Sequence, residues 1–122
     1  MEELAPWLGR LPQVVVDHLG LFRDGLPALL ALVERGARVK ASGFGRGDLD
    51  IPAALRALSE ANPEALMFGT DLPSPRALRP FADSDRDLVL DTLGEGGGRR
   101  VLYDNAVGLY RRACMQAARK RL

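Results

Sequence analysis

Residues 13–20 are Gln-Val-Val-Val-Asp-His-Leu-Gly, in which a β-branched apolar run meets polar and turn-forming residues. A continuous apolar run of this kind is typical of a strand that is covered on both faces, as in a parallel sheet. The polar residues mark the end of the strand. We therefore expect a buried strand that delivers Asp17 and His18 at its carboxyl end.

The same alternation of strand and helix continues along the chain. Apolar residues at helical spacing follow and stop at Gly36, which favours a helix that ends there. A second strand is expected over 38–42, a helix over 51–61 with Asp50 as its cap, and a third strand over 65–69. The polar residues that end the strands lie roughly 25 to 30 residues apart, which is the length of a βαβ unit. This pattern predicts parallel strands joined by helices, in an α/β sheet or barrel.

The remainder of the chain has helical character. Cap candidates at 83–85 precede an apolar stripe and predict a helix, after which the glycines of 94–98 predict a flexible linker. A last helix is expected to begin near Asn105, which is a good cap residue. At the other end of the chain, residues 2–11 have helical spacing, although Pro6 limits that helix to a short or late-starting one.

Composition narrows the class of protein. The chain has 122 residues, 47% of them hydrophobic, a formal net charge of +1 and one cysteine. These values fit one globular domain and exclude a disordered tail. The near-neutral charge argues against nucleic acid and membrane surfaces as partners, and we find neither a leader segment nor a run of about 18 apolar residues. We expect a cytoplasmic protein in which Cys114 is a packed thiol, because one cysteine forms no internal disulfide and no cysteine-built zinc site.

Candidate functional residues follow from the rule that ligands meet the carboxyl ends of parallel strands. These ends carry His18, then Ser42 with Arg46, then Thr70 with Asp71. His18, the only histidine, could bind a divalent metal or orient a water, and Asp71 could be a metal ligand or a general base. Arg46 could hold a substrate carboxylate. The alternatives are a loop or core histidine, a turn aspartate and a solvated arginine.

The glycines at 43, 45 and 47 predict a turn. They do not match a nucleotide-binding loop, because the third glycine comes one residue early for G-x-G-x-x-G and no Lys-Ser/Thr pair follows.

Four phrases stand at these strand ends and at the start of the last helix. They are Val-Val-Val-Asp-His-Leu-Gly at 14–20, Val-Lys-Ala-Ser-Gly-Phe-Gly-Arg at 39–46, Leu-Met-Phe-Gly-Thr-Asp-Leu-Pro at 66–73 and Asp-Asn-Ala-Val-Gly-Leu-Tyr at 104–110. In this order they resemble the carboxyl-terminal half of the amidohydrolase-related family. The likeness covers nearly the whole chain and is greatest to the branch that includes 2-pyrone-4,6-dicarboxylate lactonase and other predicted metal-dependent hydrolases of TIM-barrel fold.

The resemblance implies that residues 1–122 are the carboxyl-terminal half of a (β/α)8 TIM barrel, made of about the last three βα units and the closing helices. His18 would match the histidine that binds metal or the reacting carbonyl. Asp71 would match the metal ligand and general base that activates water. Ser42 and Arg46 fall where the lactonase-like branch contacts substrate carboxylates. The resemblance implies a divalent, zinc-like metal, although some lactonase-like relatives work without metal.

The sequence departs from the family in one important respect. It lacks the His-x-His pair of the first barrel strand, so His18 and Asp71 supply two of the three protein ligands of an ordinary catalytic zinc site. We therefore expect a hydrolase of small carboxylated or lactone-like substrates that is inactive alone and needs complementary strands, from an amino-terminal half or from a second copy in a homo-oligomer. The alternative is a non-catalytic truncated remnant that self-associates, since exposed strand edges favour association. A small flavodoxin-like binding domain is a third interpretation.

Overall fold

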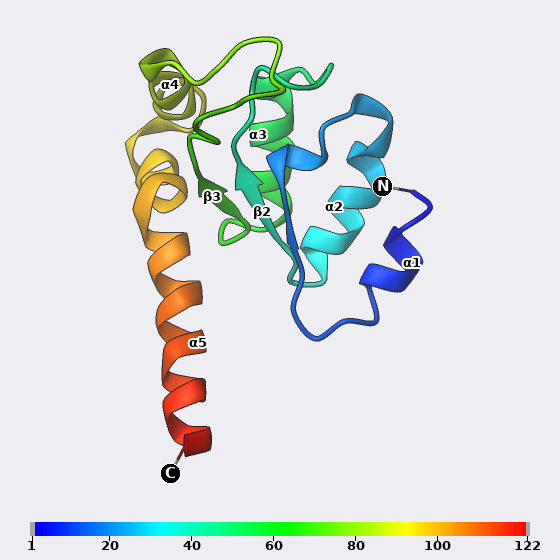
Figure 1. The fold of residues 1–122 in the computed structure, drawn as a ribbon, viewed down its shortest axis with the longest axis vertical. Helices are drawn as coiled ribbons and strands as arrows, with labels where there is room; N and C mark the ends of the chain where they lie inside the picture. The colour runs from blue at the N-terminus through cyan, green and yellow to red at the C-terminus, as the bar shows by residue number, and fades with distance from the viewer. Residues whose placement is uncertain (1, 122) are drawn as a thin grey trace.

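The computed structural model describes residues 2–121, which form a mixed α/β fold around a small parallel sheet (Figure 1). β1 (Val15–Val16), β2 (Arg38–Ala41) and β3 (Leu66–Phe68) lie in the order β1-β2-β3, and both neighbouring pairs are parallel. The predicted parallel α/β arrangement is therefore confirmed for a sheet of three strands in the described part of the chain. β1 ends just before Asp17 as predicted, and a 3₁₀ turn follows from His18, but the strand is short because Gln13 and Val14 lie outside it.

Two helices cover one face of the sheet. α2 (Leu26–Glu34) follows β1, and α3 (Ile51–Ala61) follows β2. Asp50 caps α3 as predicted, since the Ala53 N–H donates to its Oδ1 over 3.1 Å. Burial of each large aliphatic side chain stabilises the fold by about 1.5–3 kcal/mol. The core between helices and sheet contains Leu29, Val33, Val39, Leu55, Leu58 and Leu66.

The opposite face of β1 and β2 is open to solvent. Successive side chains of a strand point to opposite faces, so Val39 and Ala41 enter the core while Lys40 points away from it. Lys40 and Asp17 have side chains that are 45% and 61% exposed, and they form an ion pair of 2.9 Å. Parallel sheets are ordinarily covered on both faces. This face of the sheet is therefore partly exposed around Lys40, although Arg38 on the same face is buried.

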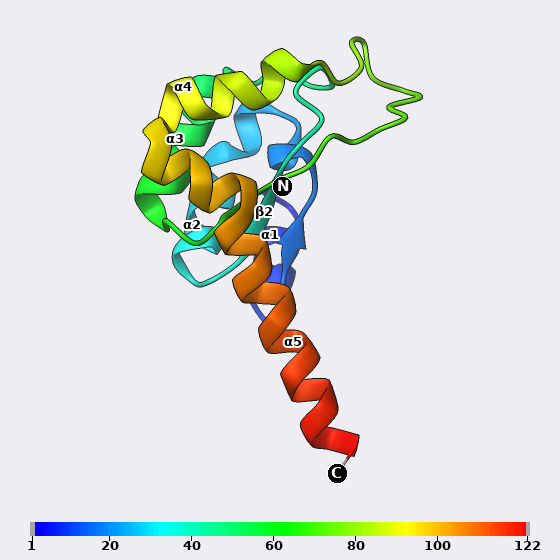
Figure 2. The ribbon, with the colours of Figure 1, turned by 90° about the vertical axis from the view of Figure 1, so that its left-hand side faces the viewer.

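Two long helices follow β3. α4 (Asp83–Arg99) leads through η3, the π-helical turn Arg100–Asp104, into α5 (Asn105–Arg121). α5 extends well beyond the sheet (Figures 1 and 2). The prediction that Cys114 is a packed thiol is wrong, because the part of α5 that carries it has no sheet beside it, and the thiol is exposed. No helix within residues 2–121 combines the length and the apolar character that crossing a membrane requires.

The prediction of a flexible linker at 94–98 is also wrong. Gly94, with a φ of 74°, departs from helical geometry, and the glycines after it belong to α4. Gly98 is buried, and a Cβ at this position would stand 2.6 Å from Cδ2 of Leu90. Close packing inside the helical segment, rather than flexibility, therefore explains why glycine occurs at 98.

The short, late-starting helix predicted within residues 2–11 is confirmed at the start of the chain. α1 spans only Ala5–Leu8, with Pro6 in its first turn. The residues after it cannot extend the helix far, because Pro12 disfavours helical geometry in the residue before it. A helix of one turn buries little, and its Trp7 is exposed.

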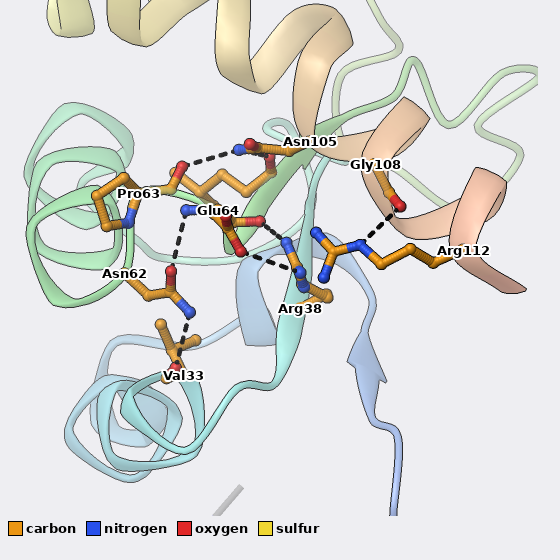
Figure 3. A network of polar contacts seen from close by, with 9 residues as sticks. Val33, Arg38, Asn62, Pro63, Glu64, Asn105, Gly108 and Arg112 are labelled. Atoms are coloured by element: carbon orange, nitrogen blue, oxygen red, sulfur yellow. Dashed lines mark hydrogen bonds and ion pairs between the residues drawn. The ribbon is translucent and has the colours of Figure 1, made fainter.

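A polar network fastens the amino-terminal ends of the strands to the helices (Figure 3). Arg38, at the start of β2, is 8% exposed, and its guanidinium contacts both the main-chain carbonyl and the carboxylate of Glu64. The side-chain Nδ2 of Asn105 donates to the carbonyls of Pro63 and Leu66, each over 2.9 Å. α5 starts at Asn105 as predicted, but Asn105 is not its cap, because η3 runs into it with helical backbone angles. Its side chain instead fastens α5 to β3.

Candidate active site

Three loops at the carboxyl-terminal ends of the strands bring His18, Ser42, Arg46 and Asp71 together. Parallel strands place these ends on one edge of the sheet, so residues far apart in the sequence become neighbours there. Asp17 and Thr70 also follow these strands, but their side chains make other contacts. Asp17 pairs with Lys40 on the open face, and the Thr70 hydroxyl accepts a hydrogen bond from the main chain two residues later.

His18 lies between a hydroxyl and a carboxylate. Its Nδ1 is 2.9 Å from Oγ of Ser42, which is a hydrogen bond. Its Nε2 is 3.7 Å from Oδ1 of Asp71, which is too long for a hydrogen bond but close enough for electrostatic attraction. The His18 and Asp71 side chains are 24% and 15% exposed, so solvent reaches the pair from one side.

Arg46 holds the other oxygen of Asp71. Its Nε donates to Oδ2 of Asp71, and both side chains are mostly buried. This hydrogen bond holds the pKa of Asp71 below its ordinary value; burial acts in the opposite direction, and the neighbouring His18 adds a smaller lowering. Asp71 is therefore a carboxylate anion with a bound cation, and Arg46 is not a freely solvated loop arginine.

The backbone has an uncommon, left-handed geometry at both candidate residues. His18 has a φ of 53° and Asp71 a φ of 62°, a region that residues other than glycine adopt rarely, although asparagine, aspartate and histidine do so more often. Leu19, Leu21 and Ser74 in the same loops share this geometry. The pattern of the sequence did not indicate it, because histidine and aspartate are also ordinary loop residues.

The glycines of the loop after β2 allow the three loops to approach one another. A Cβ at Gly45 would lie 2.1 Å from the carbonyl oxygen of Arg79, and a Cβ at Gly47 would lie 1.7 Å from that of Leu21. A Cβ at Gly43 would lie 2.9 Å from Nδ1 of His18. The loop therefore needs glycine for close contact with its neighbours.

A small cavity adjoins Asp71. It has a volume of about 10 Å³, which is close to the space that one water molecule occupies. Its walls include Phe81 and the ion pair of Arg79 with Asp85, whose closest atoms are 2.7 Å apart. The sequence pattern did not reveal Phe81 and Arg79, because the segment from 69 to 82 contains no regular helix or strand, and it indicated Asp85 only as a candidate cap residue. A substrate larger than water must therefore meet Asp71 outside this cavity.

The described residues do not form a metal site by themselves. No group of three histidine, cysteine, aspartate or glutamate side chains among them is arranged to hold a metal ion. A catalytic zinc ion ordinarily has three protein ligands. His18 and Asp71 provide two, and one Asp71 oxygen already accepts from Arg46. We therefore derive no chemical step that passes through a metal.

Comparison with known proteins agrees with this architecture. A family model described as amidohydrolase matches residues 1–112. The crystal structure of ATU3138 from Agrobacterium tumefaciens, in its apo form, is similar to this chain with a TM-score of 0.67 and 28% sequence identity. The match covers 90% of this chain and 46% of ATU3138, so the chain spans about half the length of that protein. None of the curated proteins matches this chain.

Proposed function

Because the chain belongs to the amidohydrolase family, we propose that it is the carboxyl-terminal half of a (β/α)8 barrel hydrolase. A barrel of this kind has about 250 residues, and the 46% coverage of ATU3138 supports the assignment of this chain to one half of such a barrel. The proposed substrates are small and carboxylated or lactone-like, as in the 2-pyrone-4,6-dicarboxylate lactonase branch. The observation that carries the proposal is the approach of His18 to Asp71 at the ends of β1 and β3.

The proposed reaction is the addition of water to a carbonyl carbon. The carboxylate of Asp71 removes a proton from water, and the water oxygen bonds to the carbonyl carbon of the substrate. His18 stands beside Asp71 and polarises the carbonyl oxygen as negative charge develops on it. The carbon–oxygen bond of the ester or lactone then breaks, and the proton held by Asp71 passes to the leaving oxygen.

Arg46 favours substrates with a carboxylate. While its guanidinium is bound to Asp71, that residue is a poor base, because the hydrogen bond lowers the pKa of the carboxyl group. A substrate carboxylate competes for the same guanidinium, since arginine binds carboxylates in a two-point geometry. Capture of Arg46 by the substrate then frees Asp71 to accept a proton.

The complementary strands would add at the two outer edges of the three-stranded sheet, because a closed barrel leaves no edge unpaired. Alternate residues of a parallel strand direct their main-chain groups to opposite sides. β1 bonds to β2 through Val14 and Val16, so the main-chain groups of Val15 point outward, and no other described residue bonds to them. On the outer edge of β3, the Leu66 carbonyl already accepts a hydrogen bond from Asn105. We therefore propose that one complementary strand adds beside β1 and that closure of the barrel places another beside β3.

The test is reconstitution. The chain is co-expressed with a polypeptide that corresponds to the uncovered part of ATU3138, and the complex is assayed for metal content and for hydrolysis of small carboxylated lactones and esters. We expect turnover by the complex and none by the chain alone. Asp71→Asn should lower kcat by about 10²- to 10⁴-fold, whereas Asp91→Asn, on the exposed surface of α4, should not change it. A complex that forms but hydrolyses none of these compounds, or full activity in Asp71→Asn, contradicts the proposal.

The second candidate is a non-catalytic remnant that self-associates. Large apolar side chains in β1 and in the segments before and after it are exposed, which favours self-association. They are Trp7, Leu11, Val15 and Phe22. Size-exclusion chromatography with light scattering on the chain alone separates the two. A stable homo-oligomer that an amino-terminal half does not dissociate supports the remnant. A compact monomer that unfolds cooperatively contradicts the need for any partner.

A further inference from the structure

Ser42 follows β2 and is 4% exposed, so its hydroxyl needs a partner within the protein. The partner is Nδ1 of His18, at 2.9 Å, and no other hydrogen bond to this hydroxyl occurs among the described residues. Among the described residues, no buried side-chain nitrogen or oxygen lacks a hydrogen-bond partner. The hydroxyl and the imidazole nitrogen therefore satisfy each other.

The charge on Asp71 decides the direction of this hydrogen bond. A carboxylate anion 3.7 Å from Nε2 attracts an N–H at that nitrogen and repels a lone pair. In the neutral imidazole only one nitrogen carries the proton. With the proton on Nε2, Nδ1 has a lone pair, and the Ser42 hydroxyl donates to it.

Gly43 provides the space in which the imidazole lies. A Cβ at this residue would stand 2.9 Å from Nδ1 and 3.0 Å from Cγ of His18, both inside normal contact distance. The φ of 62° at Gly43 also lies in the region that favours glycine. A side chain at 43 would therefore push the ring away from Ser42.

We propose that Ser42 and Gly43 are positioning residues for His18. The Ser42 hydroxyl donates to Nδ1 and keeps the neutral ring in the form that carries its proton on Nε2. The empty space at Gly43 lets the ring face Asp71. This inference rests on the proposed function, because an N–H directed from Nε2 into the site is what would polarise a substrate carbonyl. It also explains why serine and glycine occur at positions 42 and 43, directly after β2.

The experiment uses the fact that His18 is the only histidine. In the full chain labelled with ¹⁵N-histidine, one imidazole gives all the signals, and a long-range ¹H–¹⁵N correlation at about pH 9, where histidine side chains are neutral, identifies which nitrogen carries the proton. We expect the proton on Nε2. In Ser42→Ala the Nδ1 signal should move downfield, toward that of a nitrogen without a hydrogen bond.

Matched control variants distinguish a positioning role of Ser42 and Gly43 from a general loss of structure. Ser59→Ala, in α3, makes the same chemical change away from the site and should leave both signals in place. Gly43→Ala should shift both signals by displacing the ring, whereas Gly96→Ala, where a Cβ meets nothing within 4 Å, should not. Circular dichroism confirms that each variant is folded. A proton found on Nδ1, or an Nδ1 signal that Ser42→Ala does not move, overturns the proposal.

An activity measurement distinguishes this inference from the proposed function. In an active reconstituted complex, Ser42→Ala should lower kcat by about ten- to a hundredfold, the range known for hydrogen-bond partners of metal-ligating histidines, and leave KM nearly unchanged. An unchanged kcat would overturn the positioning role while the hydrolase proposal stands. If no complex is active, the hydrolase proposal fails, and the NMR measurement still decides the role of Ser42.

Discussion

Replacing Asn105 by alanine should weaken the fold by about 2 kcal/mol. Its Nδ2 donates to the carbonyls of Pro63 and Leu66 over 2.9 Å each, and the residue is buried. A typical hydrogen bond contributes about 1 kcal/mol net, and a buried carbonyl that loses its donor costs at least as much. For a domain of this size, the loss corresponds to a decrease in Tm of roughly 8 °C.

An isosteric variant sharpens the test. Asn105→Asp keeps the shape of the side chain but replaces the donor with an oxygen, which then faces two carbonyl oxygens. Urea denaturation at pH 7 should therefore give the order wild type, alanine, aspartate, from the highest to the lowest free energy of unfolding. Gln116→Ala, on an exposed part of α5, is the control and should have no effect. An aspartate variant as stable as the wild type would refute the reasoning.

Three further predictions concern the loops and the exposed helix. Gly47→Ala places a Cβ 1.7 Å from a carbonyl oxygen and should lower Tm in calorimetry, whereas Gly96→Ala should raise the stability by roughly 0.5–1 kcal/mol, because alanine favours helix and meets no obstacle there. The lowered pKa of Asp71 stabilises the fold above the ordinary value of 3.8, and this contribution is lost as the pH falls below it. The stability lost in Arg46→Gln should therefore be largest at neutral pH and shrink under acid, and a difference that grows in urea melts at pH 3 would contradict the assignment. Cys114 should react with a thiol reagent equally fast in the native and the denatured protein, since it is exposed; strong protection in the native state would show that α5 is covered.

The location of the site could be predicted from the sequence because strand topology determines it. Once the apolar run that ends before Asp17 and residues 38–42 and 65–69 are recognised as parallel strands, their carboxyl ends must meet, and His18 and Asp71 then become neighbours. The chemical roles of these residues stay predictions.

Other features depend on tertiary packing that no local pattern contains. The glycines of 94–98 predict a linker by their composition. Gly98 instead belongs to α4 and packs closely against Leu90. Cys114 lies beside an apolar stripe that predicts burial, but α5 extends past the sheet. The ion pair of Arg79 with Asp85 joins the irregular segment before α4 to the first turn of that helix. Neither helical nor strand periodicity gives a signal in such a segment, so the pair could not be predicted.

The left-handed backbone at His18 and Asp71 also bears on how this sequence can change over generations. Glycine would adopt the same turns without steric cost, whereas a residue with a Cβ is less stable there. A lineage that drifts without selection for chemistry therefore has a simple mutational route to greater stability at both positions. Leu19, Leu21 and Ser74, which have no proposed chemical role, have the same left-handed geometry, so this route has been left unused throughout these loops and not at His18 and Asp71 alone.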